Sequence, residues 1–330
     1  MIEVLSQGAL ATVQDLGRVG ALRWGVGTAG AMDPVALACG NLLLGNEEGA
    51  AAIEVPVFPF EVGFEAGCAV ALTGADCAAT LDGVPLPPWS ATTARAGAVL
   101  RLGLPLSGRW RGARAYLCVA GGIDVPVVLG SRSTQLRGAI GGLEGRMLRQ
   151  GDRLAPAPPA PDAPRPVEVG IVPPALALPL EADGHVAVRA LPAAEYACFT
   201  QGSREAFWAE PWKVTAQSDR YGFRLAGPAL EPLAPMEMRS HGIVPGVVQV
   251  PQGGQPIVQM RDAQPSGGYP KIATVIEADL WRLGQVPIGS RIRFVETDWD
   301  AALAARDELA GWLAEVRRLL DLHRARSPAR

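Results

Sequence analysis

The sequence predicts a mainly β protein that ends in an amphipathic helix, and three observations carry this prediction. Glycine (39) and proline (29) are frequent in a chain of 330 residues, which favours short strands joined by tight turns. Apolar residues make up 48% of the chain, enough to bury a sizeable core. Most apolar segments are short and valine-rich, as at 69–72, 116–120 and 246–250, and their glycine or proline borders are typical of strands.

Two segments depart from this strand pattern and are expected to be helices. In 33–45, Asp33 can cap free backbone amides, Pro34 suits the first helical position and Gly45 suits the exit. In 298–325 the apolar residues recur at helical spacing: Trp299, Leu303, Trp312, Val316, Leu319 and Leu320. This periodicity predicts an amphipathic helix packed on the body of the protein.

A proline-rich run, APAPPAPDAPRP at 155–166, divides the chain. It has too many prolines to join a sheet and too little apolar surface to fold, which is typical of a semi-rigid linker. We therefore expect an N-terminal β-barrel-like domain at 1–154 and a C-terminal β-barrel-like domain at 167–330 that ends in the helix. Either domain could be a barrel or a sandwich, and either could lend a strand to the other.

The charge balance and the rare residue types exclude several functions. The 30 basic and 33 acidic side chains lack the basic excess that nucleic-acid binding requires. No segment reaches eighteen uninterrupted apolar residues and no leader pattern opens the chain, so we expect a cytoplasmic protein that does not bind membranes. The five cysteines have no zinc or redox spacing and there are only three histidines, so no metal site is expected.

One nucleotide-binding pattern occurs and is rejected. Residues 25–30 read GVGTAG, which matches the dinucleotide fingerprint letter by letter. That fingerprint needs a buried strand before it and a helix that begins within it. Here the expected helix begins only at Pro34, so we expect no nucleotide at this segment.

The segment TVQDLGR at 12–18 sets an amide, a carboxylate and a guanidinium close together. Gln14 and Asp15 could exchange hydrogen bonds with an amide or a lactam, and Arg18 could hold a carboxylate through two parallel hydrogen bonds. A surface turn whose charges pair with each other is the alternative interpretation.

In the C-terminal half, polar side chains are dense between apolar strands at 218–264, which suggests one lined cavity. His241 lies beside a glycine turn and could act as a general acid or base near neutral pH, although a structural histidine is the alternative. Lys271 is one of only two lysines and follows the glycines at 267–268. Such a pair lets backbone amides approach a ligand, but a solvated loop lysine would have the same sequence.

At these residues the chain resembles a known family, the biotin-dependent carboxyltransferase-like proteins and the second subunits of allophanate-hydrolase type. The resemblance covers about residues 2–294 and rests on long motifs in the same order. These motifs are TVQDLGR at 12–18, GAMD at 30–33, RAYLCVAGGIDVP at 114–126, SDRYGFRL at 218–225, VVQVPQGGQPIV at 247–258 and GGYPKIATVIEADL at 267–280.

Within the family, SHG at 240–242 and GGLEGR at 141–146 look like the bacterial ATP-dependent 5-oxoprolinases. This resemblance implies cyclophilin-like barrels and a complex with subunits A and B that converts 5-oxoproline and ATP into glutamate, ADP and phosphate. ATP would be a cosubstrate of the complex, because this chain has no recognisable phosphate loop. Two alternatives remain: a carboxyltransferase that acts on urea or a similar amide through carboxybiotin, and a regulatory protein that antagonises a kinase inhibitor.

The motifs and the polar pattern together give one set of candidate site residues. We expect catalytic roles for His241, Asp262 and Asp15. The expected substrate-binding residues are polar members of the same segments: Gln14, Arg18, Asp33, Arg220, Gln249, Gln255, Tyr269 and Lys271. An arginine or Lys271 would hold a substrate carboxylate, and His241 or an acid would transfer the proton.

Overall fold

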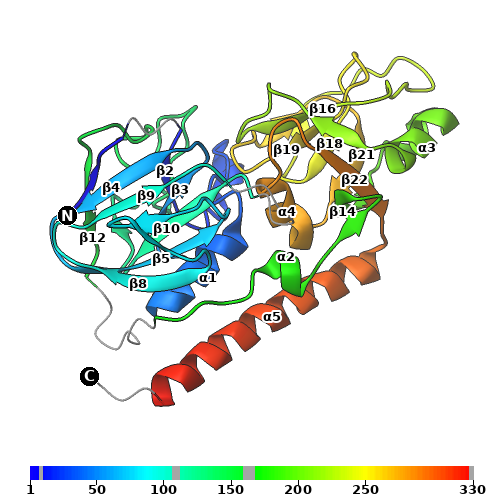
Figure 1. Ribbon diagram of the computed structural model, residues 1–330. Helices are drawn as coiled ribbons and strands as arrows, with labels where there is room; N and C mark the ends of the chain where they lie inside the picture. The colour runs from blue at the N-terminus through cyan, green and yellow to red at the C-terminus, as the bar shows by residue number, and fades with distance from the viewer. Residues whose placement is uncertain (7–9, 106–111, 159–167, 327–330) are drawn as a thin grey trace. The chain divides into compact units, whose positions relative to one another are not determined.

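The computed structural model is mainly β with a long C-terminal helix, as predicted, and it describes residues 1–6, 10–105, 112–158 and 168–326 (Figure 1). The chain divides into two units. The first comprises Met1–Arg18, Ala29–Ala177 and Ala310–Arg330, and the second comprises Val19–Thr28 and Leu178–Leu309. Most of the predicted linker at 155–166 lies outside the described residues, so the predicted domain limits stay a prediction.

Two antiparallel sheets form the described core of the first unit. The larger sheet has the strand order β11 (Ile123–Asp124), β12 (Arg153–Pro156), β1 (Ile2–Val4), β4 (Phe60–Phe64), β9 (Val99–Leu102), β6 (Thr80–Leu81) and β7 (Val84–Pro85). The other has the order β2 (Thr12–Gln14), β3 (Ala52–Val55), β10 (Ala115–Val119), β5 (Cys68–Gly74) and β8 (Ser90–Ala94). Both sheets supply side chains to one hydrophobic cluster. The core of this unit therefore lies between the two sheets.

Helix α1 (Pro34–Leu44) packs on the five-stranded sheet against β5 and β10. The carboxylate of Asp33 accepts a hydrogen bond of 2.8 Å from the amide of Ala36, and Gly45 ends the helix in the left-handed conformation at φ 75°. These are the start and stop signals that the sequence contains. The predicted helix at 33–45 is confirmed.

A closed ring of strands builds the second unit. Its order is β14 (His185–Pro192), β21 (Lys271–Val275), β18 (Val247–Gln249), β19 (Ile257–Gln259), β16 (Gly222–Ala226), β15 (Trp212–Val214) and β22 (Arg291–Glu296), with β13 (Glu181–Ala182) added beside β14. Parallel pairing of β22 with β14 closes the ring. Because a closed sheet has no free edge, every strand of the ring is paired on both sides.

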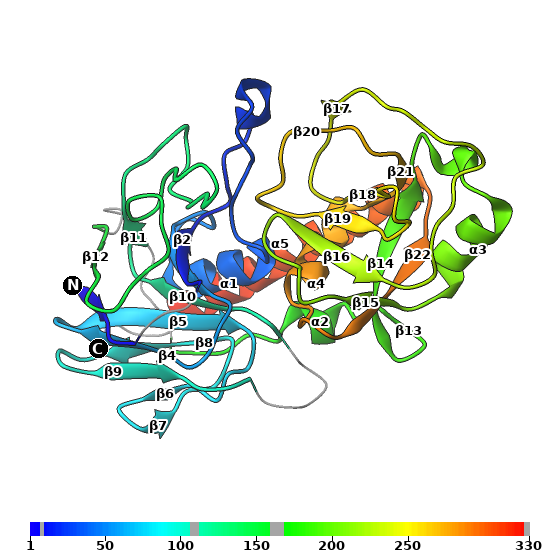
Figure 2. The ribbon, with the colours of Figure 1, turned by 90° about the horizontal axis from the view of Figure 1, so that it is seen from above.

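Several short elements lie outside the three large sets of strands. The two-residue strands β17 (His241–Gly242) and β20 (Ser266–Gly267) pair in a separate small sheet, visible at the upper edge of Figure 2. Helix α3 (Gln201–Ala209) was not predicted, and it places Phe207 in a stacked contact with Phe294 of β22 at 4.5 Å between ring centroids. The remaining short elements are α2 (Pro174–Ala177), α4 (Leu280–Gly284) and the 3-10 turns η1 (Ala21–Trp24), η2 (Tyr196–Cys198) and η3 (Glu277–Asp279).

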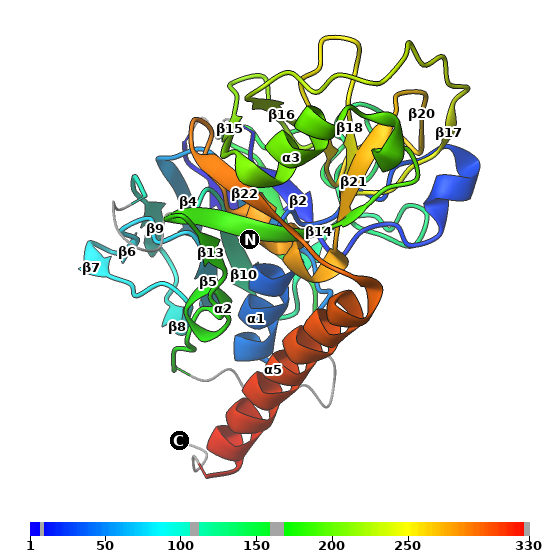
Figure 3. The ribbon, with the colours of Figure 1, turned by 90° about the vertical axis from the view of Figure 1, so that its right-hand side faces the viewer.

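The C-terminal helix α5 (Trp299–Arg326) is the long helix of Figure 3 and confirms the helix predicted at 298–325. Val316 and Leu320 are buried, as the periodicity indicates, whereas Trp299 is 67% exposed and Leu319 is 52% exposed. Only part of the predicted apolar face is therefore covered. No helix in the described ranges is long and apolar enough to cross a membrane.

Candidate functional site

The second unit holds a cluster of polar side chains around Lys271. Lys271 Nζ lies 2.9 Å from Glu195 Oε2, and the same oxygen accepts a 3.1 Å hydrogen bond from the backbone amide of Lys271. Lys271 Nζ also contacts Nε2 of His241, whose Nδ1 lies 3.1 Å from the carbonyl oxygen of Arg239. The side chains of Lys271 and Glu195 are 14% and 17% exposed, so solvent reaches the cluster only in part.

Three separate segments bring these side chains together. His241 opens β17 and pairs with Gly267 of β20, Lys271 opens β21, and Glu195 directly precedes η2. A Cβ atom on Gly267 would lie 2.5 Å from Nε2 of Gln249. Glycine at 267 therefore lets the strand pair that carries His241 lie directly on the buried amide of Gln249.

Two buried glutamines lie on the neighbouring strands β18 and β19. Gln249 lies opposite Lys271 in the register of β18 and β21, next to a β-bulge. Gln259 Nε2 donates to Gln249 Oε1 at 3.0 Å, and Gln249 Nε2 donates to the carbonyl oxygen of Tyr269 at 3.4 Å. Because the carbonyl oxygen of Tyr269 can only accept, Gln249 must donate through Nε2. Its Oε1 then accepts from Gln259, so the orientation of both side-chain amides is fixed. We call Glu195, His241, Gln249, Gln259 and Lys271 the Lys271 cluster.

Glu195 is ionised in this setting. Partial burial opposes its charge, but the side-chain and backbone hydrogen bonds from Lys271 outweigh burial, and the pKa of Glu195 lies below its usual value. Sequence analysis selected neither Glu195 nor Gln259 as a site residue. Gln259 could have been found from the polar pattern at 218–264, whereas Glu195 has no local signal.

Arg220 and Asp262 form a second polar pair in this unit. Arg220 donates to both carboxylate oxygens of Asp262, at 3.0 and 2.9 Å, and the two side chains are 10% and 8% exposed. A two-bond pair this buried is strongly oriented. The amide of Gln255 instead bonds the backbone of Gly227, at 3.0 and 3.1 Å. The side chain of Tyr269 is half exposed.

In the first unit, Asp15 ties the segment at 12–18 to the segment at 131–133. Its carboxylate accepts hydrogen bonds from the hydroxyls of Ser131 and Ser133 and from the amides of Gly17 and Arg132. These four donors match the roughly four lone-pair sites of a carboxylate. The hydrogen-bond acceptor sites of the Asp15 carboxylate are therefore occupied by groups of the two segments.

Gln14 and Arg18 are both fully buried beside Asp15. Gln14 Nε2 donates to Thr12 Oγ1 at 2.9 Å and to the carbonyl oxygen of Thr134 at 3.1 Å. Arg18 Nη2 donates to the carbonyl oxygen of Ser133. Burial of both side chains contradicts the alternative interpretation of a surface turn. The substrate-binding interpretation stays a prediction.

Asp33 belongs to another buried network. Besides capping α1, it donates its backbone amide to the hydroxyl of Tyr116 at 2.8 Å, and that hydroxyl donates to Glu54 Oε2 at 2.8 Å. Burial, together with the charges of Glu54 and Asp33, raises the pKa of Tyr116 well above its usual value. Tyr116 therefore stays protonated and serves as a hydrogen-bond bridge.

The predicted site residues thus fall into separate groups. Gln14, Asp15, Arg18 and Asp33 lie in the first unit, and Arg220, His241, Gln249, Gln255, Asp262, Tyr269 and Lys271 lie in the second. Hydrogen bonds join His241 to Lys271, Gln249 to Tyr269 and Arg220 to Asp262. Within the described residues, no group of three His, Cys, Asp or Glu side chains is placed to hold a metal ion.

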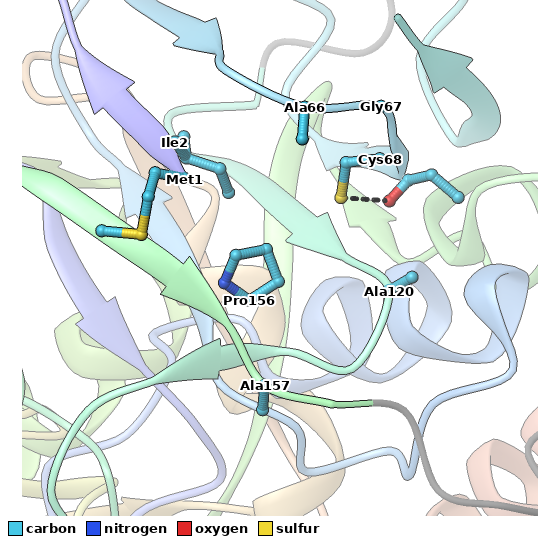
Figure 4. Close-up of a pocket in the computed structure, with 9 residues that line it drawn as sticks. Met1, Ile2, Ala66, Gly67, Cys68, Ala120, Pro156 and Ala157 are labelled. Atoms are coloured by element: carbon cyan, nitrogen blue, oxygen red, sulfur yellow. Dashed lines mark hydrogen bonds between the residues drawn. The ribbon is translucent and has the colours of Figure 1, made fainter. Parts of the chain in front are cut away.

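A pocket of about 240 Å³ in the first unit is apart from these groups (Figure 4). Its lining is mostly apolar and includes Met1, Ile2, Pro156 and Cys68, whose thiol points to the carbonyl oxygen of Ala69. Burial raises the pKa of Cys68, which keeps the thiol protonated and weakly reactive. We assign no chemistry to this pocket.

Residues 24–296 match the family model of the carboxyltransferase domain, subdomain A and B. The chain belongs to this family. It is 43% identical over 314 residues to the C subunit of 5-oxoprolinase from Escherichia coli K12, covering 93% of this chain and 95% of that protein. It is 42% identical to the C subunit of 5-oxoprolinase from Haemophilus influenzae, covering 97% and 99%.

Larger members of the family contain the same fold. Urea amidolyase of Saccharomyces cerevisiae is 32% identical over 320 residues, which are 93% of this chain and 17% of that protein. The crystal structure of Kluyveromyces lactis urea amidolyase aligns with a TM-score of 0.87 at 29% identity, covering 96% of this chain and 20% of that one. The carboxyltransferase fold thus recurs within multidomain proteins.

Proposed function

We propose that this chain is the C subunit of an ATP-dependent 5-oxoprolinase, which converts 5-oxo-L-proline into L-glutamate as ATP is hydrolysed. The observation that carries the proposal is the identity to two bacterial C subunits over nearly the whole of both chains. Subunits A and B would be the partners, and the cytoplasm the compartment. Each of the two units would be a cyclophilin-like barrel.

The chemistry of the reaction fits a complex. A lactam is a resonance-stabilised amide, and its opening near neutral pH calls for activation of the lactam oxygen by phosphoryl transfer. ATP would be a cosubstrate of the whole complex, bound by one of the partners or at a site without a recognisable motif. This chain would contribute groups that bind and protonate the lactam.

The Lys271 cluster is the substrate site that we propose. Lys271 offers a cation for the carboxylate of 5-oxoproline, and His241 and Lys271 together offer a proton-transfer pair. The buried pair of Arg220 and Asp262 would complete the site in the second unit. Gln14, Asp15 and Arg18 of the first unit are separate candidates.

Reconstitution with subunits A and B tests this proposal. The complex should form ADP and glutamate only when 5-oxoproline is present. His241→Ala should lower turnover about 100-fold, the scale of general acid-base catalysis. His185→Ala, at the start of β14 and outside the cluster, is the matched control. Arg18→Ala should also lower turnover, with its folding checked by thermal melting. Unchanged turnover in His241→Ala and in folded Arg18→Ala would contradict the assignment of these residues to the substrate site.

A second candidate is a carboxyltransferase that acts on urea or a similar amide. It is favoured by the structural match to Kluyveromyces lactis urea carboxylase, with a TM-score of 0.87. Carboxyl transfer of this kind would require a biotinylated partner. Streptavidin capture of the protein from its native cell separates the two functions, because a biotinylated protein that copurifies with this chain would favour carboxyl transfer.

A further inference from the structure

One oxygen of Glu195 binds both nitrogen atoms of Lys271. Glu195 Oε2 lies 3.1 Å from the backbone nitrogen and 2.9 Å from Nζ of Lys271. A lysine side chain is otherwise free to rotate about four bonds. Two contacts to the same carboxylate oxygen bend the side chain back toward its own backbone and fix the position of the ammonium group. That position is against Nε2 of His241.

The hydrogen-bond partners of His241 determine which ring nitrogen carries the hydrogen. Nδ1 faces the carbonyl oxygen of Arg239 at 3.1 Å. A carbonyl only accepts, so Nδ1 carries a hydrogen. The ammonium group of Lys271 only donates, so Nε2 is its acceptor and has no hydrogen of its own. The hydrogen bond between Lys271 Nζ and His241 Nε2 therefore contains one hydrogen, which the ammonium group donates.

The charges around this pair come from three elements. Glu195 precedes η2, Lys271 begins β21 and His241 begins β17. Burial opposes the charge of Glu195, but the two hydrogen bonds from Lys271 and the positive charge of Lys271 lower the pKa of Glu195. A carboxylate thus lies beside the Lys271–His241 pair.

We infer that Glu195 is a positioning residue, which holds Lys271 on Nε2 of His241 so that Lys271, rather than the imidazole alone, presents the shared proton. This inference rests on the proposed function. When the O-phosphorylated lactam opens, water forms the new C–O bond and the C–N bond breaks. The two protons of that water pass through the Lys271–His241 pair to the ring nitrogen, so the pair ends the step as it began. The products are the amine and an acyl phosphate, from which a second water releases phosphate.

Nitrogen-15 NMR of the isolated chain tests the positioning without any turnover. The chain has three histidines, so labelled imidazoles give few signals, and His241→Gln identifies those of His241. The wild type should show Nδ1 protonated and Nε2 unprotonated. Glu195→Gln and Lys271→Met should both shift the Nε2 signal of His241, because each variant removes the ammonium group from its fixed position on Nε2. Glu231→Gln, which removes an exposed carboxylate of the same unit, should leave it unchanged. An unaltered His241 spectrum in folded Glu195→Gln would overturn the inference.

Kinetics of the complex with subunits A and B provide the second readout. Glu195→Gln should lower kcat about tenfold and change KM for 5-oxoproline by less than that. Glu195→Asp, which keeps the charge, should restore part of kcat, and Glu231→Gln should match the wild type. Wild-type kcat in Glu195→Gln would contradict the inference. If the wild-type complex has no turnover, the proposed function fails, while the NMR result still decides the geometry. If Glu195→Gln does not fold, Lys271→Met decides: an unaltered Nε2 signal of His241 contradicts the inference.

Discussion

The guanidinium of Arg146 makes a two-bond contact with Asp152, at 2.7 and 2.9 Å. This hydrogen bonding, with a further bond from the amide of Arg149, outweighs burial and lowers the pKa of Asp152. A carboxyl group whose pKa is lower in the folded state stabilises the fold at any pH above its unfolded pKa. That contribution is lost as the pH falls through the folded pKa.

Asp152→Asn should therefore lower the free energy of unfolding at pH 7 by about 1–2 kcal/mol. The difference from the wild type should shrink as the pH falls below about 4, the ordinary range of an aspartate. Urea unfolding at several pH values measures both effects. Glu144→Gln is the control, because Glu144 contacts the same arginine but is 71% exposed, and it should cost less than about 0.5 kcal/mol. A constant difference between wild type and Asp152→Asn from pH 7 to pH 3 would contradict the assignment.

Among the turns, the glycine pair at 141–142 packs its backbone against the segment at 12–18. Gly141 has φ +67°, and a Cβ there would overlap Arg18 Nη2 and the carbonyl oxygen of Ser133. Gly151 has a similar φ of +84°, but a Cβ there would meet nothing within 4 Å. Both positions carry the strain of a left-handed backbone, whereas only Gly141 is crowded.

Gly141→Ala and Gly151→Ala form a matched pair that separates strain from crowding. Gly151→Ala should cost about 1 kcal/mol. Gly141→Ala should cost several kcal/mol more, because Arg18 and Ser133 are buried and must move. Thermal unfolding of the two variants measures the difference. Equal losses of stability would mean that crowding against Arg18 and Ser133 adds nothing to the cost of the left-handed backbone.

How far the elements could be predicted depends on whether their signals are local. Helix α1 was found because Asp33, Pro34 and Gly45 all lie within the helix and its caps. Helix α3 was missed because it is only nine residues long and Thr200 is its one start signal. In the structure the hydroxyl of Thr200 accepts a 3.2 Å hydrogen bond from the amide of Ser203. A barrel was expected as one alternative for the C-terminal half, but the strand pair that closes it was not predictable, since the pairing of β14 with β22 joins distant parts of the chain.

The same reason limits what the sequence says of the site. His241 and Lys271 were selected one by one, from the glycines beside them, and the structure joins them in one contact. Glu195 lies 76 residues from Lys271 along the chain and has no neighbouring motif, so only the fold reveals it.

At the scale of the whole molecule, the five cysteines report on folding in both units. Four lie in the first unit and Cys198 lies in the second. Cys39, Cys77 and Cys118 are buried, Cys68 is partly buried and Cys198 is exposed. Burial raises the pKa of Cys77 to about 12 and that of Cys39 and Cys118 well above the usual value. Since the thiolate is the reactive form, these three should be inert in the folded protein.

Titration with a thiol reagent at pH 8 should therefore label Cys198 rapidly, Cys68 slowly, and all five cysteines only in denaturant. Cys198→Ser should abolish the rapid phase. In a urea series, release of Cys39, Cys77 and Cys118 together would follow unfolding of the first unit, because their side chains are buried in that unit. Circular dichroism at the same urea concentrations follows both units, so thiol release at lower urea than the main transition would show that the first unit opens before the second. Rapid labelling of more than two thiols in native buffer would contradict the burial on which this prediction rests.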